Sequence, residues 1–274
     1  MSRRATALAL AAAACLPGLG CGGGGAASIP ASQARSAASP AGLAARLATA
    51  DAGLRRALRA WRAADPALRS APPRAALAAA AKERSIVHAL VGHPAIARRT
   101  IAELPASVAP AIRADLLAAG DLRRLDGPPP KHPAVLHLVP PRPAGALLAD
   151  YRLGERRFGV RWQVLAAVNL VESAFGRVVN RSSAGAQGPM QFLPATWRAY
   201  GLGGNVHVAR DAVLGAANYL HRSGAPGDER AALHAYNPSN LYVDAVLDYA
   251  GAMTRDPLAY LAYYAWEASL PATL

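Results

Sequence analysis

Apolar side chains in the first half of the chain recur at the spacing of amphipathic helices. In the first block the arginines fall largely on other faces than the apolar stripe, which consists of Leu43, Leu47, Leu54, Leu58 and Trp61. A second block covers about residues 74–90, and prolines interrupt the pattern on both sides of it. Residues 41–126 are therefore predicted to form a helical region of about four short helices.

The second half repeats the helical spacing, and no alternating strand pattern of useful length appears. Pro194 suits the first turn of a helix, and Asp211 and Asp228 suit N-caps. The predicted helices cover residues 147–158, 162–175, 195–200, 212–221, 229–236 and 241–253. The predicted fold class is mainly α. A helical domain at 144–274 is preceded by an Ala/Arg-rich helical region.

Residues 127–143 join the two regions and are rich in proline. Proline lacks a backbone N–H and fixes φ, so this stretch cannot be helical. We expect an extended connector or a strap across a neighbouring surface.

The start of the chain has the pattern of an export signal. Arg3 and Arg4 precede an uncharged stretch, and Cys21 opens a run of small residues that extends to about residue 40. We expect a signal peptide at 1–20, which would remove Cys15, and a flexible tether at 21–40. Cys21 is the expected lipid attachment site, although Leu19 lies closer to it than in the usual lipoprotein pattern. The expected location is the cell envelope, by a lipid anchor on the outer face of the cytoplasmic membrane or, alternatively, by simple secretion.

Composition agrees with a helical, folded chain. Alanine makes up 68 of the 274 residues and apolar residues 53%, which favours helix and argues against a disordered chain. Both cysteines lie within the first 21 residues, so the remainder cannot hold cysteine-ligated metal or a thiol nucleophile. The seven histidines lack metal-ligand spacing. No metal and no cofactor are therefore predicted.

The net charge of +13 is unevenly distributed. Residues 1–150 hold 19 basic and 8 acidic side chains, whereas residues 151–274 hold 11 and 9. The basic region is expected to pack on the second domain as a platform that faces anionic wall polymers or lipid headgroups. Such charge also attracts nucleic acid, but export makes that partner improbable, and an arginine-rich face is most often only a solubilising surface.

Glu172 is the outstanding candidate for chemistry. It falls in the last turn of the predicted helix at 162–175, on or beside the apolar face. Burial and the negative end of the helix dipole both disfavour a carboxylate there, so its pKa should be raised toward neutrality, as a general acid requires. The alternative is a solvated glutamate at a helix end.

Glu172 begins a series of ordered motifs. They are Glu172-Ser173, Gly188-Pro189-Met190-Gln191 and Ala235-Tyr236-Asn237. Over about residues 160–250 this series resembles the lysozyme-like catalytic domain of bacterial lytic transglycosylases, which cleave the glycan strands of peptidoglycan. The front half and the tail are similar to secreted or lipoprotein members from high-GC Gram-positive bacteria.

The resemblance implies roles for these residues. Glu172 and Tyr236 would be catalytic, with Tyr236 contacting the substrate acetamido group or orienting Glu172. The expected substrate-binding residues are Ser173, Gly188, Met190, Gln191, Phe192 and Asn237. The alternatives are a hydrogen bond at the helix terminus for Ser173, and packing alone for Met190, Phe192 and Tyr236.

Two prolines depart from the common family pattern. Pro189 stands where many members have leucine and is expected to stiffen the turn without removing a functional group. Pro238 follows Asn237 directly and should bias that residue away from helical geometry.

The implied reaction uses a single acid. No Asp or Glu occurs between Ser173 and Arg210, whereas most glycoside hydrolases use two carboxylates. The family reaction fits: Glu172 protonates the bond between N-acetylmuramic acid and N-acetylglucosamine, the acetamido group assists, and a 1,6-anhydro ring forms. The alternatives are a lysozyme-type hydrolase of the same fold and a non-catalytic peptidoglycan-binding envelope lipoprotein.

Overall fold

The computed structural model describes residues 39–128 and 135–271. The predicted signal peptide, Cys21 and nearly all of the predicted tether lie outside the described residues. Within the described ranges the structure consists of helices and two isolated β-bridges, so the prediction of a mainly α fold is confirmed. No helix in those ranges is long and apolar enough to cross a membrane.

The helical region before the connector contains four of these helices. They are α2 (Pro40–Ala64), α3 (Arg74–Val91), α4 (Pro94–Ala102) and α5 (Ala109–Asp126). The apolar stripe of α2 is buried as its spacing predicts, and Ser39 caps the helix by accepting a hydrogen bond from the Gly42 N–H. Proline occupies the first turn of α2, α4 and α5, where its missing N–H costs no hydrogen bond.

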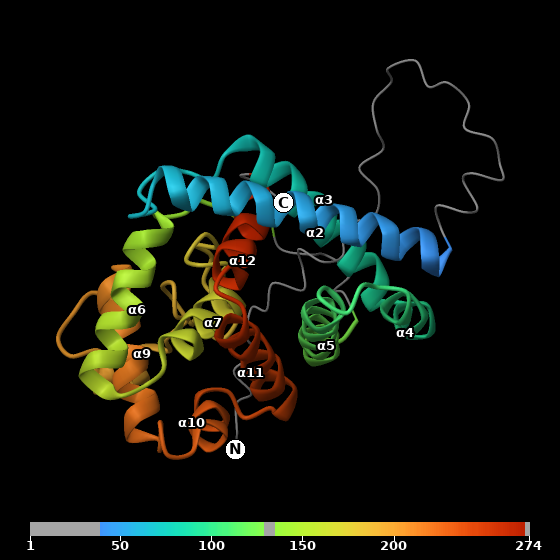
Figure 1. Ribbon diagram of the computed structural model, residues 1–274. Coiled ribbons are helices and arrows are strands. Elements are labelled where there is room, and N and C mark those ends of the chain that lie inside the picture. Colours follow the sequence, from blue (N-terminus) through green and yellow to red (C-terminus); the bar gives the residue numbers. More distant parts are fainter. Residues whose placement is uncertain (1–38, 129–134, 272–274) are drawn as a thin grey trace.

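The second region contains the remaining described helices. They are α6 (Ala144–Phe158), α7 (Trp162–Ser173), α8 (Pro194–Tyr200), α9 (Ala209–Arg222), α10 (Glu229–Tyr236), α11 (Asn240–Arg255) and α12 (Ala259–Ala268). In Figure 1, α7 lies at the centre of this region, and it packs against α6 and α11. The domain boundaries themselves remain a prediction.

Two details differ from the sequence expectations. Helix α9 begins at Ala209 with Val208 as its N-cap, so Asp211 is not the cap; its carboxylate accepts from the Asn205 N–H at 2.9 Å instead. Asp228 does cap α10, as predicted. Helix α12 was not predicted, because its side chains are apolar on all sides and show no amphipathic stripe.

One hydrophobic core extends through both regions. It joins Leu54 of α2 and Val87 of α3 to Val168 of α7 and Tyr264 of α12. Helix α5 lies against α11, and α12 lies against α3 and α2. The helical region therefore packs directly on the second domain, as the sequence predicts for a platform.

Polar bonds from α12 reinforce this shared core. The Trp266 indole N–H donates to Glu83 of α3 at 3.0 Å, and the Tyr263 hydroxyl donates to Asp115 of α5 at 2.6 Å. The Tyr264 hydroxyl donates to the Arg142 carbonyl at 2.8 Å. Helix α12 thus ties both earlier helices and the end of the connector to the second domain.

The described part of the connector, residues 135–143, forms the strap that proline content suggested. Leu138 pairs with Val178 in an isolated antiparallel bridge. The Val139 N–H donates to the Arg177 carbonyl at 2.8 Å, and the Val179 N–H donates to the His137 carbonyl at 3.1 Å. The strap therefore runs along the segment that directly follows α7.

Candidate functional site

Glu172 is the penultimate residue of α7, a helix in which ten of the twelve residues are buried. Its side chain is buried, with 4% of the residue exposed. The helix ends at Ser173, two residues before the predicted end, because Ala174 and Phe175 adopt left-handed φ values of 52° and 61°. The position of Glu172 in the last helical turn is as predicted.

The environment of Glu172 raises its pKa to about 7, and burial is the main cause. The Tyr242 hydroxyl donates a hydrogen bond to Glu172 Oε1 at 2.8 Å, which stabilises the ionised form and limits the rise in pKa. No second carboxyl group contributes to this shift. Glu172 is therefore a single carboxyl poised to exchange a proton near neutral pH.

The tyrosine that contacts Glu172 is Tyr242 of α11, which the sequence motifs did not indicate. Tyr236 instead donates from its hydroxyl to the Met190 carbonyl at 2.6 Å. Its ring stacks on that of Tyr242, with centroids 6.5 Å apart and planes at 7°. The sequence did hold one signal for this contact. Tyr242 lies on the buried face of the predicted helix at 241–253, and a buried tyrosine hydroxyl needs a hydrogen-bond partner.

Ser173 is wholly buried and anchors the loop that holds the second motif. Its hydroxyl donates to the Pro189 carbonyl and accepts from the Gly176 N–H at 2.9 Å. Asn169, one turn earlier on α7, also donates to the Pro189 carbonyl, at 2.7 Å, and accepts from Tyr151. The sequence analysis missed this Asn169 bridge. Contact between Ser173 and substrate stays a prediction.

The second motif forms a tight turn against the core. Gly188 has φ of 74°, and a Cβ atom there would lie 2.0 Å from the Val206 carbonyl oxygen, so no other residue fits. The Gln187 and Phe192 backbones exchange hydrogen bonds of 3.0 and 2.9 Å across the turn. The role of Gly188 seen here is therefore to shape the turn.

Gln191 is the polar side chain of this turn. Its Nε2 donates to the Gly188 carbonyl at 3.0 Å, whereas its Oε1 atom is buried without a hydrogen-bond partner. A buried acceptor without a partner is costly unless a ligand or water supplies a donor. The side chain is thus arranged to accept a hydrogen bond, as substrate binding would require.

Met190 and Phe192 are packed in the core, with 0% and 2% of the residue exposed. The Phe192 ring meets Trp197 and Tyr236 edge to face, with centroids at 5.2 and 5.9 Å. This packing is the structural reading that the sequence left open, and a wall of the substrate groove stays a prediction for both. Asn237 is buried and extended, with φ of −139°, as Pro238 favours.

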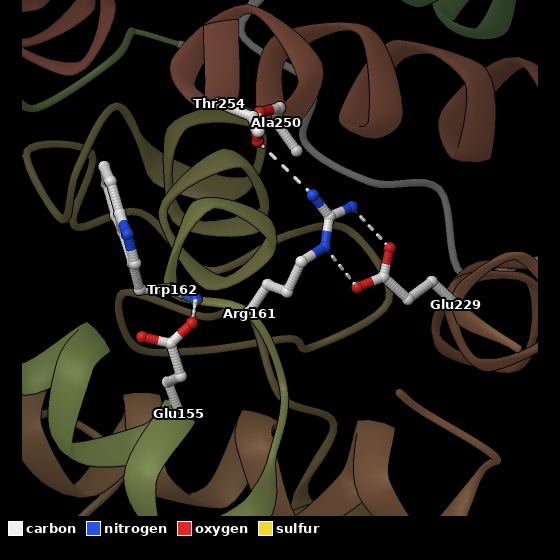
Figure 2. Close-up of polar contacts among 6 residues, drawn as sticks. All are labelled: Glu155, Arg161, Trp162, Glu229, Ala250 and Thr254. Carbon is white, nitrogen blue, oxygen red and sulfur yellow. Dashed lines mark hydrogen bonds and ion pairs between the residues drawn. The ribbon is translucent and has the colours of Figure 1, made fainter. Parts of the chain in front are cut away.

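The opposite end of α7 is held by polar and charged side chains of three neighbouring helices (Figure 2). Arg161 forms a bidentate ion pair with Glu229 of α10, with N···O distances of 2.7 and 2.6 Å. Its third nitrogen donates to Thr254 of α11 at 3.3 Å. Glu155 of α6 accepts from the Trp162 N–H at 3.2 Å. This arrangement, the Arg161 clamp, fixes α7 relative to the helices that carry Tyr236 and Tyr242.

The site shows no sign of a metal centre. Among residues 39–128 and 135–271, no group of three or more His, Cys, Asp or Glu side chains is placed to hold a metal ion. The raised pKa of Glu172 and its contact with Tyr242 suit proton transfer by Glu172 and hydrogen bonding by its neighbours.

Comparison with known families identifies this part of the chain. Residues 152–257 match the family model of the transglycosylase SLT domain. No curated protein and no solved structure shows significant similarity to the chain. The matched range contains Glu172, Tyr236, Tyr242 and the Arg161 clamp. The chain therefore carries a transglycosylase SLT domain, the lysozyme-like helical catalytic domain of lytic transglycosylases, a family that acts on peptidoglycan.

Proposed function

We propose that this protein is a peptidoglycan lytic transglycosylase in which Glu172 alone serves as acid and base. The observation that carries the proposal is a buried carboxyl group with a pKa of about 7 and no carboxyl partner, inside an SLT domain. Two-carboxylate hydrolysis requires a second Asp or Glu across the bond. Two other acids of the domain have structural roles, because Asp228 caps α10 and Glu229 pairs with Arg161.

The proposed reaction proceeds in two steps. Glu172 first donates its proton to the oxygen of the bond between N-acetylmuramic acid and N-acetylglucosamine, and the acetamido oxygen of the muramoyl residue attacks C1 as the bond breaks. The resulting oxazolinium-like intermediate replaces a covalent enzyme adduct. The ionised Glu172 then takes the proton of the muramoyl C6 hydroxyl, whose oxygen bonds to C1 as the bond between C1 and the acetamido oxygen breaks and the N-acetyl group is restored. Glu172 ends the cycle protonated, and no water is consumed.

The neighbours of Glu172 fit this cycle. Tyr242 holds Oε1, which leaves the other carboxyl oxygen to exchange the proton, and its hydrogen bond steadies the ionised intermediate state. Tyr236 is proposed to contact the acetamido group, and the free acceptor of Gln191 to receive a donor from the glycan. Asn237 is proposed as a further binding residue.

Mass spectrometry of digested peptidoglycan tests the reaction. The expected products end in 1,6-anhydromuramic acid and are lighter by one water than those of a lysozyme-type hydrolase, so reducing muramic ends would replace this proposal by hydrolysis. Glu172→Gln should release no products. Asp244→Asn is the matched control, because it also neutralises a carboxyl group of the same domain, one that lies on the surface and pairs with Arg230. A fold-intact Glu172→Gln variant with full activity would contradict the proposal.

The surface of the helical region supports a second proposal, namely binding to anionic wall polymers. Four of its seven acids, Asp51, Glu83, Asp115 and Asp121, are buried, whereas Glu103 is exposed and Asp65 and Asp126 are half-buried. Its exposed cations are Arg46, Arg56, Arg59, Arg62, Arg69, Arg74, Lys82, Arg98, Arg99, Arg113, Arg123 and Arg124. This inside-outside sorting leaves a strongly basic surface.

Sedimentation with purified walls at increasing salt tests this proposal. Binding of the Glu172→Gln variant should weaken with salt and with reversal of the arginines on the exposed face of α2. Salt-insensitive binding would contradict an electrostatic contact. Binding that follows lipid vesicles of anionic headgroups but not walls would assign the surface to the membrane.

We also propose that the protein is exported and lipid-anchored through Cys21. Metabolic labelling with a palmitate analogue tests the anchor. Label should be incorporated by the natural chain and lost in Cys21→Ser. Export without label would indicate simple secretion instead.

A further inference from the structure

A cavity lies where the helical region meets the SLT domain, away from the proposed catalytic residues. Its volume is about 50 Å³, and its walls come from α3, α5, α7, α11 and α12. Leu170 and Val171 of α7 contribute, but Glu172, Tyr236 and Tyr242 do not line it. The cavity therefore adjoins the catalytic helix without being part of the site described above.

The cavity combines apolar walls with polar atoms that have no partner. Val87, Leu122 and Trp266 form much of the wall. Three of the lining residues each hold one buried atom without a hydrogen-bond partner: Arg84 Nε, His88 Nδ1 and Glu267 Oε2. The side chains of Arg84 and Glu267 are only 11% and 8% exposed. Such a group of orphan atoms is uncommon in a folded protein and points to an occupant that supplies the missing hydrogen bonds.

The volume limits the size of that occupant. A single water needs roughly 10–15 Å³ of such space, and an engineered apolar cavity of about 150 Å³ admits benzene. The cavity thus accepts a group of roughly four non-hydrogen atoms.

The charges limit its chemistry. Arg84 Nε and Glu267 Oε1 are 4.0 Å apart, too far for a hydrogen bond. Burial and the nearby Arg84 lower the pKa of His88 to about 3, so the imidazole is neutral. A charged ligand would face a like charge on Arg84 or Glu267. A neutral group with an acceptor and a donor side by side can instead accept from Arg84 Nε and donate to Glu267 Oε2.

We propose that this cavity binds a small amide group, with the amide oxygen accepting from Arg84 and the amide N–H donating to Glu267. A methyl or methylene attached to the amide would lie against the aromatic wall. In peptidoglycan, two sources carry this chemistry: the acetamido groups of the sugars and the amides of the stem peptides. This choice of sources rests on the proposed function, whereas the amide preference of the cavity does not.

Titration with small probes tests the amide preference. Acetamide, acetone and acetate have similar size, but only acetamide is neutral and offers both an acceptor and an N–H donor. The reporter is the NMR signal of the Trp266 indole N–H, because Trp266 lines the cavity. Acetamide should bind with millimolar affinity and about fivefold or more tightly than acetone or acetate. Equal binding of all three, or no binding of acetamide, would overturn the proposal.

A filled cavity supplies the matched control. Ala119 of α5 lines the cavity, so Ala119→Leu should abolish the acetamide response. Ala111 is a similarly half-buried alanine of α5 that does not line it, and Ala111→Leu should leave the response unchanged. Melting curves check that both variants fold. An acetamide response that survives in folded Ala119→Leu would place binding elsewhere and overturn the proposal.

Larger probes then distinguish the two sources. Chitobiose with both acetamido groups tests the sugar, and N-acetyl-D-alanyl-D-alanine tests the peptide. Both titrations use Glu172→Gln, so that a failed catalytic proposal does not affect the result. A shift of the Trp266 signal that Ala119→Leu removes assigns the amide to the probe that causes it.

Discussion

Two parts of this molecule bury carboxyl groups in the same way, and only one of them belongs to the SLT motifs. Around α7, Glu172 accepts from the hydroxyl of Tyr242. At the junction with the helical region, Glu83 accepts from the Trp266 indole and Asp115 from the Tyr263 hydroxyl. Burial raises the pKa of Glu83 to about 8 and those of Asp115 and Glu172 to about 7.

The comparison teaches that a raised pKa does not identify a catalytic acid. Each of these carboxyls is buried beside an aromatic donor, and structural networks perturb a pKa as strongly as active sites do. What separates Glu172 is its place at the end of α7, beside the turn of Gly188 and Gln191. The junction acids instead join α12 to α3 and α5, the helices of the region that precedes the SLT domain.

Neutralising one carboxyl in each region should give the largest difference. Glu172→Gln removes the proposed proton donor and should lower turnover of peptidoglycan about 10²–10⁴-fold. Glu83→Gln keeps the shape of the side chain and should leave turnover within about threefold of the natural protein. Assays of released muropeptides under matched conditions check both. Comparable losses in the two variants would erase the proposed distinction.

The activity profile with pH should respond to only one tyrosine. The proposed reaction begins with protonated Glu172, so kcat/KM should fall as pH rises above about 7. Tyr242→Phe removes a hydrogen bond that lowers the pKa of Glu172, so the fall should move to higher pH. Tyr263→Phe removes the matching bond to Asp115 and should leave the profile in place. A shift toward lower pH in Tyr242→Phe would reverse the assigned electrostatics.

The free energy of unfolding should fall as pH rises, because both regions contain buried carboxyl groups. The folded protein keeps protons on Glu83, Asp115 and Glu172 at pH values where the unfolded chain has released them, so the free energy of unfolding falls between about pH 4 and 8. Each group contributes a slope of up to about 1.4 kcal/mol per pH unit. Glu83→Gln should make the dependence of the unfolding free energy on pH less steep up to about pH 8. Glu172→Gln should do so only up to about pH 7. Thermal melts across this range measure it.

The smallest expected effect concerns the Arg161 clamp. Arg161→Ala should lower the free energy of unfolding by about 1 kcal/mol or less, because the ion pair is partly exposed. It should nevertheless lower kcat a fewfold with little change in KM, because α7 is then less firmly held relative to Tyr242. Arg230 pairs with Asp244 between α10 and α11 but is more exposed, so Arg230→Ala is the control. Equal kinetics in both variants would make the clamp purely structural.

The sequence predicts the helices well where an apolar stripe or a cap marks them. It predicts the buried position of Glu172 because helical periodicity places residue 172 near the apolar face. It does not predict α12, whose faces are all apolar, or the contact with Tyr242, which depends on how α11 packs on α7. The Asn169 bridge to the Pro189 loop is likewise tertiary, since no local pattern joins residues 20 positions apart.

Helix α12 also changes what counts as the folding unit. The SLT match ends at residue 257, yet Tyr260 packs edge to face on Trp162 and on Phe175, with centroids at 5.9 and 5.7 Å. A fragment trimmed to residues 152–257 would lack Tyr260. It would expose the rings of Trp162 and Phe175 at the two ends of α7 and should aggregate. The range that matches the SLT family is therefore smaller than the unit that packs as one core, and any shortened form of this protein should keep α12.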